Sequence, residues 1–337
     1  MHTYTSRSLI VALSLFVLPG LAGCGDSQSG TDSDSGETSE SGESNGTGDM
    51  LSAFSLQFAA SVDGQAVGCA DAISGLGPAG DITVGISDLR FYISNLRFFD
   101  SGGNELAVEL DTNEFQYSSE AGDVALIDLT SNTEGTCADA AISFAEGTAR
   151  TNAVITGMTE VELVARVAFD VGVPQTVMKE TIANNTAEGA PSPLAEMYWS
   201  WASGYRHFVF NFTIGNDGGE SGEGYIHIGS RDCAADGFNA LEDRETCGLV
   251  NTPTVMLDAF DLTSGTVTLD VKAALAGLDF MVPILDPDTM EQIGEGPGVA
   301  CHATPTEPDC ASVFTAFGLD PATGAASEAN SSAFTEM

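Results

Sequence analysis

Several segments of the chain alternate between apolar and polar residues with a period of two, which is typical of β-strands that bury one face. Helical periodicity is confined to two short segments, 273–278 and 311–317. The pattern predicts an all-β fold, an antiparallel β-sandwich with a few short helices, over residues 51–337; two smaller β domains are the alternative. The alternating apolar positions are Phe54, Leu56 and Phe58; Ile82, Val84 and Ile86, leading into 89–93; Val161, Leu163 and Val167, leading into Phe169; and Phe208, Phe210, Phe212 and Ile214.

Two pairs of these runs are expected to form hairpins. The step Ser264-Gly265 is expected to turn the chain between strands at 255–257 and 266–269. A Gly-rich acidic loop at 216–224 is expected to close a second hairpin. The loop could bind calcium through its side-chain oxygens, but it lacks the EF-hand spacing, and a plain hairpin loop is the other interpretation.

The N-terminal residues 1–23 have the layout of a signal peptide. Arg7 supplies positive charge, and the apolar run at 9–18 is too short to span a bilayer. The run leads to Leu21-Ala22-Gly23-Cys24, which resembles a bacterial lipobox, so we expect cleavage before Cys24 and lipidation of its sulfur. Residues 24–50 then form a disordered acidic Ser/Gly linker behind the lipidated cysteine. We expect an exported lipoprotein anchored at the outer membrane; an ordinary secretory signal with a chance cysteine is the alternative.

Composition and motifs narrow the function classes. The chain has 10 Lys+Arg against 49 Asp+Glu, a formal net charge of −39, which argues against nucleic-acid binding because phosphate backbones would repel it. Hydrophobic residues make up 43% of the chain, enough to build a core. The sequence has no GxSxG, HExxH, phosphate-binding-loop or dinucleotide motif. We therefore expect a protein that is not an enzyme and has no catalytic residues.

Six cysteines follow Cys24, and an even number in an exported chain suggests three disulfides. Short loops containing Gly, Pro or Asp favour Cys233–Cys247 and Cys301–Cys310, which leaves Cys69–Cys137 as a long-range bridge. The absence of any CxxC pair argues against a thiolate metal site. We expect structural bridges, each stabilising the fold by roughly 2–4 kcal/mol.

Both tryptophans lie in one short segment, Met197-Tyr198-Trp199-Ser200-Trp201-Ala202-Ser203-Gly204-Tyr205. At positions i and i+2 of an extended segment, the indoles of Trp199 and Trp201 point to one face. A packed aromatic pair in the core is one interpretation, and a functional pair is the other.

Taken in order, this segment and six others resemble the MbnP-like family, the methanobactin-associated four-Cys proteins of the "metallo-mystery pair". Each piece alone is short, but together they cover nearly all of 51–337, which is therefore expected to be an MbnP-like domain. The other pieces are Ile86-Ser87-Asp88-Leu89-Arg90-Phe91-Tyr92-Ile93-Ser94; Gly172-Val173-Pro174; Ser192-Pro193-Leu194; His227-Ile228-Gly229-Ser230 with Cys233; Cys247 followed by Asn251; and Cys301 to Cys310 running into Phe314-Thr315-Ala316-Phe317-Gly318-Leu319.

The resemblance implies an exported protein that binds copper and is encoded with a dihaem peroxidase-like partner, MbnH. That partner oxidises a tryptophan of its client to kynurenine, which helps to form the metal site. On this chain the matching tryptophans are Trp199 and Trp201, and the matching histidine is His227. The chemistry is coherent, because imidazole suits copper and kynurenine exposes a carbonyl and an aniline nitrogen as new ligands.

The chain departs from the family pattern at two places. The Asn-His that usually follows Gly-Val-Pro is absent from residues 175–180, and His302 stands where Met usually follows the first cysteine of the last pair. We therefore take His302 as a second candidate ligand and Met178 as a soft alternative for Cu(I). The alternative function is a metal-free or calcium-stabilised surface β-sandwich with a structural or adhesive role.

The expected hairpin around loop 216–224 separates two of the histidines. Matching its apolar faces places His227 opposite Asn211 or Thr213. His207 is then on the order of 13 Å away, at about 3.3 Å per residue, so the two cannot share a metal. We expect His207 to lie at the surface.

Overall fold

A computed structural model describes residues 51–130, 137, 151–185, 189–200, 203–234, 241–327 and 330–337. They belong to one compact unit, Gly48–Met337. The expected signal peptide, Cys24 and the linker up to residue 50 lie outside the described residues, and so does Trp201.

Strands dominate this unit, and the helices are short. No helix in the described ranges is long and apolar enough to span a bilayer. The strands are β1 (Ser52–Val62), β2 (Gln65–Val67), β3 (Ala72–Leu76), β4 (Ile82–Phe99), β5 (Glu105–Leu106), β6 (Glu109–Leu110), β7 (Gln116–Ser119), β8 (Gly122–Asp128), β9 (Val154–Thr159), β10 (Arg166–Val171), β11 (Tyr198–Ser200), β12 (Gly204–Asn216), β13 (Ser221–Gly229), β14 (Thr254–Leu257), β15 (Thr266–Asp270), β16 (Met281–Leu285), β17 (Gln292–His302) and β18 (Phe334–Glu336). The helices are α1 (Gln175–Asn184), α2 (Val271–Ala274) and α3 (Pro308–Ala316), with 3₁₀ helices η1 (Val161–Leu163) and η3 (Leu241–Asp243).

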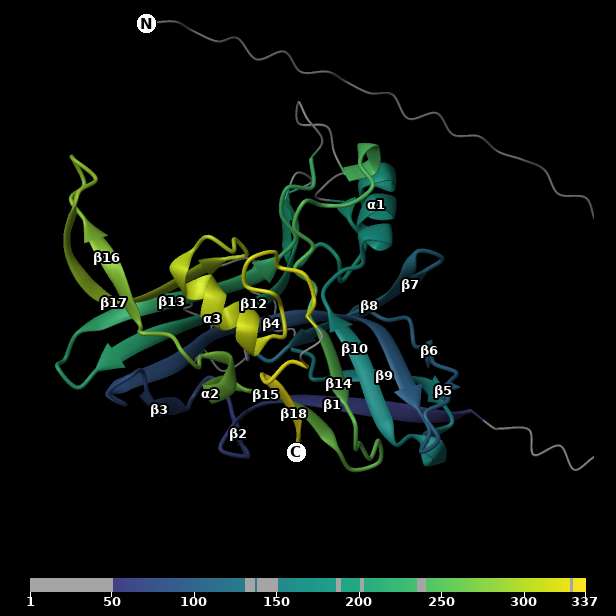
Figure 1. The fold of residues 1–337 in the computed structure, drawn as a ribbon. Helices are drawn as coiled ribbons and strands as arrows, with labels where there is room; N and C mark the ends of the chain where they lie inside the picture. The colour runs from purple at the N-terminus through teal and green to yellow at the C-terminus, as the bar shows by residue number, and fades with distance from the viewer. Residues whose placement is uncertain are drawn as a thin grey trace, which may run out of the picture. The chain divides into compact units, whose positions relative to one another are not determined.

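Within the described residues the strands form two sheets, which confirms the all-β sandwich (Figure 1). The small sheet has the order β18-β15-β1-β9-β6, and the large sheet has the path β14-β10-β4-β12-β13-β17-β16. Their apolar faces meet in one core, where the ring of Phe58 from the small sheet lies 6.0 Å from the rings of Phe91 and Phe169 of the large sheet. Most side chains at the predicted apolar positions therefore face the interior between the two sheets.

Two strand pairs are parallel, so both sheets are mixed. β15 runs parallel to β1 in the small sheet, and β17 runs parallel to β13 in the large sheet. A parallel pair needs a long connection between its strands, and alternation within a strand carries no information about its partner. The β13–β17 pair brings parts of the chain together that are distant in the sequence.

The hairpin of β12 and β13 is confirmed, but its predicted register is wrong, because His227 pairs with Val209 and not with Asn211 or Thr213. The hairpin explains the two faces of the large sheet. Phe208 pairs with Ile228, and Phe210 pairs with Ile226, on the face toward the small sheet. Residues between these positions point to the other face, which is partly covered by α1. Gly224 is required in this hairpin because a Cβ there would lie 2.0 Å from the Phe212 ring.

Two local predictions were wrong, and one helix was missed. The strands at Thr254–Leu257 and Thr266–Asp270 do not pair with each other: β14 joins β10 in the large sheet, and β15 joins β1 in the small sheet. Both strands carry apolar residues into the same core from opposite sides, which a short hairpin would not allow. Residues Val161–Leu163 form a 3₁₀ turn with Leu163 exposed, and helix α1 was not predicted at all.

The three predicted disulfides are confirmed. The structure joins Cys69 to Cys137, Cys233 to Cys247, and Cys301 to Cys310, with Cα–Cα separations of 5.4, 4.0 and 4.8 Å. The last bridge ties the start of α3 to the end of β17, next to His302.

Candidate metal centre

Two histidines from distant parts of the chain meet on the parallel pair β13–β17. His227 and His302 are register partners, and their ring centroids lie 5.3 Å apart. Their neighbours Ile226 and Ile228 face the core, so the two imidazoles lie on the opposite face of the large sheet. The structure therefore brings together the two histidines that the sequence proposed as ligands.

The two histidines end a row of residues that crosses five neighbouring strands. From β8 to β17 the register partners are Asp128, Arg90, Val209, His227 and His302. Asp128, Arg90 and His227 are all buried. One face of the sheet thus carries a charged, largely buried strip that leads to the histidine pair.

His227 is held as a neutral imidazole. Only 6% of the residue is exposed, and burial, together with the charge of Arg206, lowers its pKa to about 3. Its Nε2 lies 2.9 Å from Oδ1 of Asn211, and because that oxygen only accepts, Nε2 donates. In this tautomer the lone pair is on Nδ1. A ligating histidine commonly has its other ring nitrogen fixed in this way.

His302 is the more accessible of the two histidines. Its side chain is 39% exposed, and Nδ1 lies 3.7 Å from Oε2 of Glu307. The backbone N–H of His302 also donates to Oε2 of Glu307, which lies just before α3. Glu307 therefore fixes the main chain at the point where β17 delivers His302.

Trp199 lies near the same centre between two arginines. The guanidinium carbon of Arg231 lies 5.0 Å from the Trp199 ring centre, and that of Arg206 lies 5.9 Å from it. Arg231 also donates a 2.8 Å hydrogen bond to the backbone oxygen of His302. Arg231 therefore connects the tryptophan segment to the histidine pair, as cation–π contacts and hydrogen bonds can do.

Arg90, which lies in the same register row as His227 and His302, forms a buried ion pair with Asp88. This ion pair was not identified from the sequence. Arg90 donates from Nε and Nη2 to the two oxygens of Asp88 over 2.7 and 2.6 Å. Burial raises the pKa of Asp128 to about 7, although the Thr130 N–H and the Arg90 charge oppose the shift. The available signal was a pair of charges at i and i+2 in an apolar strand, Asp88 and Arg90, which alternation places on one face.

His207 does not lie at the surface as expected. It is fully buried, and burial lowers its pKa to about 4. Nδ1 accepts from the Val173 N–H over 3.2 Å, so Nε2 carries the proton toward the Val250 oxygen at 3.1 Å. An irregularity in the register between Arg206 and Phe208 turns His207 inward, which period-two reasoning could not predict.

Three other groups of potential ligands take part in other interactions in the described residues. Met178 is fully buried, and its sulfur accepts from the Ser230 hydroxyl at 3.6 Å in a separate apolar cluster. Cys301, Glu307 and Cys310 converge, but the two sulfurs form a disulfide and are not thiolate ligands. In the loop proposed for calcium, Asn216 and Glu220 hydrogen-bond each other and close the hairpin turn.

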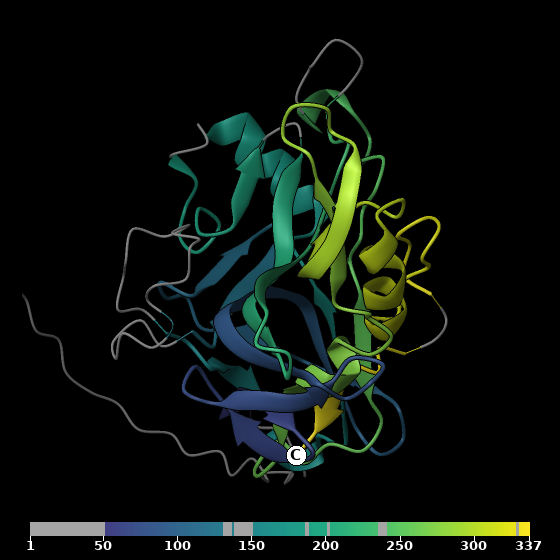
Figure 2. The ribbon, with the colours of Figure 1, turned by 90° about the vertical axis from the view of Figure 1, so that its left-hand side faces the viewer.

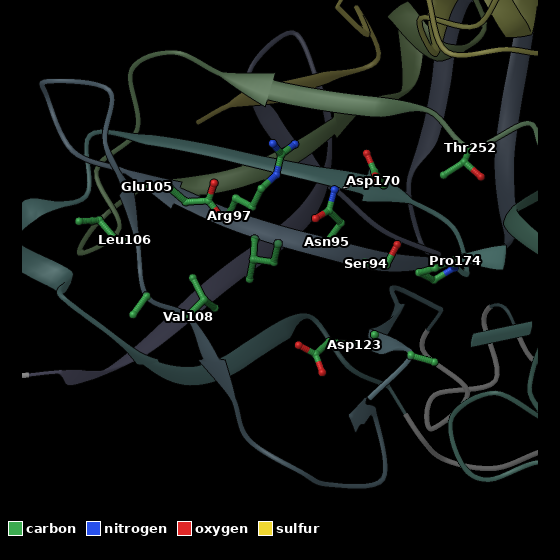
Figure 3. Close-up of a pocket in the computed structure, with 14 residues that line it drawn as sticks. Ser94, Asn95, Arg97, Glu105, Leu106, Val108, Asp123, Asp170, Pro174 and Thr252 are labelled. Atoms are coloured by element: carbon green, nitrogen blue, oxygen red, sulfur yellow. Dashed lines mark hydrogen bonds between the residues drawn. The ribbon is translucent and has the colours of Figure 1, made fainter. Parts of the chain in front are cut away.

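A cavity of about 550 Å³ lies beside β4, where no described strand fills the gap between β8 and β5 (Figure 3). Asp123 and Asp170 line it from opposite sides, with Ser94 and Arg97 on β4. No residue proposed as a metal ligand lines this cavity. The cavity and the histidine pair are therefore separate features.

The described residues form a disulfide-linked β-sandwich, and comparison assigns it to a known family. The family model described as MbnP matches residues 52–291, so the chain belongs to the MbnP family. Among solved structures, MbnP from Methylosinus trichosporium is similar, with a TM-score of 0.61 and 22% identity over 85% of this chain and 98% of that chain. At this identity the likeness shows the shared fold. No curated protein matches the chain.

Proposed function

We propose that this protein binds one copper ion at a centre that includes His227 and His302, and that it is not an enzyme. The observation that carries the proposal is the register pairing of these histidines on β13 and β17, with ring centroids 5.3 Å apart. Neutral imidazole is a preferred copper ligand, and burial keeps His227 neutral at physiological pH. No proton has to leave His227 when a metal binds.

The donor set fits a soft, low-coordinate ion better than zinc. All six cysteines of the domain are in disulfides, so thiolate ligands are not offered. Two imidazoles support Cu(I), which accepts few ligands, and a further ligand would complete the site.

We assign the further ligand to an oxidised tryptophan, Trp199 or Trp201. Family membership and the position of Trp199, joined to His302 through Arg231, support this assignment. Conversion to kynurenine would be carried out by a dihaem peroxidase-like partner of the MbnH type, within the methanobactin system. Two molecules of hydrogen peroxide would supply the oxidising equivalents, and C2 of the indole would leave as formate. The oxidised residue would add a carbonyl oxygen and an aniline nitrogen to the imidazole donors. His227 and His302 would then bind the ion, and Arg231 would hold the modified segment beside them.

We further propose that the protein is exported and lipid-anchored at the outer membrane through Cys24. The support is the sequence alone: the apolar run, the lipobox-like Leu21-Ala22-Gly23-Cys24 and the acidic linker. An exported location agrees with three disulfides, which persist in oxidising compartments.

The test is copper titration of protein purified from its native host, combined with mass spectrometry of the peptide that contains Trp199 and Trp201. We expect one copper per chain, a peptide with the mass of one kynurenine, and loss of binding in His227→Gln and His302→Gln. Glutamine at 227 retains a donor for Asn211, so folding is checked by an unchanged thermal transition. An unmodified peptide with negligible copper uptake by wild type would favour the metal-free or calcium-stabilised structural protein, and stabilisation by calcium would decide between those two.

A further inference from the structure

The hairpin of β16 and β17 exposes an unusual amount of apolar surface. Five of the large hydrophobic residues that are exposed in the described ranges belong to this one hairpin, and Met290 and Ile293 are 67% and 65% exposed. Clustered exposed apolar residues mark interaction surfaces, whereas scattered ones need no explanation. The five are Met281, Ile284, Leu285, Met290 and Ile293.

The hairpin is built as a projecting arm. β16 is the last strand of the large sheet, and the hairpin stands away from the other strands in Figure 1. Its tip is ordered by Asp286, whose carboxylate accepts from the N–H groups of Asp288 and Thr289 at 2.9 Å. A two-stranded ribbon has little core of its own. The apolar side chains are therefore not needed for packing within this chain.

The charge of the hairpin restricts what can cover it. Asp286, Asp288, Glu291 and Glu295 lie on or beside the tip, and the sequence has no Lys or Arg after Lys272. A second copy of this chain would carry the same acidic hairpin and would be repelled by it. The hairpin would also repel an anionic bilayer. Charge complementarity selects a protein with an apolar patch surrounded by basic residues.

The edge of β16 favours recognition by side chains over strand addition. Pro283 lies in the middle of this edge strand and has no N–H to offer to an added strand. A partner would therefore bind the apolar side chains of the arm and the acidic groups around them. Such a mixture of apolar anchors and a charged rim is the usual composition of a specific interface.

The arm and the candidate metal centre share one strand and one side of the large sheet. β17 runs from Ile293 in the arm to His302, a span of about 30 Å at about 3.3 Å per residue. The arm rises on the side away from the small sheet, which is also the side of the histidine pair (Figures 1 and 2). A globular partner seated on the arm would reach over half-exposed His302 and Trp199.

From these observations we propose that the β16–β17 arm is the docking surface for the basic haem protein that modifies the tryptophan segment. This proposal rests on the proposed function, because it assigns the binding surface of the same partner. The arm binds the partner, and the tryptophan is modified at the candidate metal centre, some distance along β17. Docking and copper binding are consequently separable by mutation.

The experiment uses the full chain and a purified dihaem peroxidase-like protein of the MbnH type as the probe, with hydrogen peroxide as oxidant. It measures both direct binding and formation of the modified tryptophan peptide. The apolar variant is Ile284→Ser with Ile293→Ser, and the charge variant is Asp288→Asn with Glu291→Gln. Leu163→Ser is the matched control, because Leu163 is 47% exposed on η1, outside the arm. We expect the apolar variant to raise the KM for this chain about tenfold or more at unchanged kcat. The charge variant should raise KM at low salt only, and the control should behave as wild type.

The outcomes separate the two proposals. Wild-type rates and affinities for both arm variants would overturn the docking proposal and leave the proposed function intact. Binding of wild type that the arm variants lose, without any tryptophan modification, would support docking and contradict the kynurenine part of the function. Absence of both binding and modification would overturn both. Arm-variant protein that has been fully modified by prolonged incubation with the haem protein should bind copper as wild type does.

Discussion

The guanidinium of Arg231 lies over the face of Trp199, with 5.0 Å between the guanidinium carbon and the ring centre. The same group donates to the carbonyl oxygen of His302. Arg231 also forms a backbone bridge with Leu249, close to the Cys233–Cys247 disulfide. One side chain therefore connects the tryptophan segment, strand β17 at His302 and a disulfide loop, and it is the first target for mutation.

We predict that Arg231→Met weakens both stability and copper binding. Loss of the cation–π contact and of the hydrogen bond should cost about 1 kcal/mol, because Arg231 is only partly buried. Thermal unfolding measures the first effect, and copper titration measures the second. Arg231→Lys retains a cation over the ring and should recover most of the stability. Equal copper affinity in Arg231→Met and wild type would show that Trp199 and His302 do not depend on this connection.

The low pKa of His227 predicts a pH-dependent contribution to stability. Between about pH 3 and about pH 6.5 the unfolded chain binds a proton at this residue that the folded chain does not bind. Stability should therefore rise with pH through this window and stay constant above it. His227→Gln removes the titration, so the difference in free energy of unfolding between wild type and variant should grow by up to a few kcal/mol across the window. Urea unfolding at several pH values measures it, and a difference independent of pH would contradict the prediction.

Asp128 should act in the opposite direction. Burial raises its pKa to about 7, beside the Asp88 and Arg90 charges, so the folded chain binds a proton between about pH 4 and about pH 7 that the unfolded chain has released. Wild type should lose stability relative to Asp128→Asn as the pH rises through this window. The difference should level off above it. Asp123→Asn is the control, because Asp123 lies on the same strand at its other end and lines the cavity.

Loss of the Cys69–Cys137 disulfide should mainly lower stability, whereas loss of the Cys301–Cys310 disulfide should also lower copper affinity. Replacing Cys69 and Cys137 by serine opens a 68-residue separation and should cost about 4 kcal/mol, whereas the 9-residue separation of Cys301 and Cys310 should cost about 3 kcal/mol. Copper affinity should fall mainly in the second variant, because His302 adjoins Cys301. Calorimetry and copper titration of both variants check this ranking. Loss of copper affinity in the first variant at a temperature where it is folded would contradict it.

The anchor is tested by Cys24→Ser. Serine lacks the sulfur that receives the acyl chain, so the variant should carry no labelled lipid and should leave the membrane fraction. Labelling with a fatty-acid analogue followed by fractionation checks both points. A variant that still carries the label would show that the lipobox interpretation is wrong.

Period-two alternation predicted most of the fold because it reports burial directly. Phe208, Phe210 and Phe212 alternate in the sequence and lie together in the core. The pairing of strands was less predictable. The sequence predicts Thr266–Asp270 as the second strand of a hairpin, yet this strand pairs in parallel with β1. Helix α1 was missed because its buried residues, Val177, Met178, Thr181 and Ile182, include a polar residue and follow a proline that looked like a loop.

The candidate site was only partly predictable for the same reason. The resemblance selected His227, and a departure from the family pattern selected His302, but no local pattern shows that two residues 75 positions apart share a register. His207 shows the limit most clearly, because a single irregularity in β12 moves it from the expected surface to the interior. The arginines around Trp199 come from β12 and from the bridge at Leu249, and neither proximity follows from sequence spacing.

The parallel pairing of β13 with β17 sets an order of assembly. Until the chain has been made as far as His302 and β17 has joined the sheet, the protein presents His227 alone and no shared centre. Tight copper binding would then be acquired only when the whole domain has folded, so that partly folded or truncated chains would release the metal to complete ones. Metal occupancy would therefore report the quality of each molecule's folding.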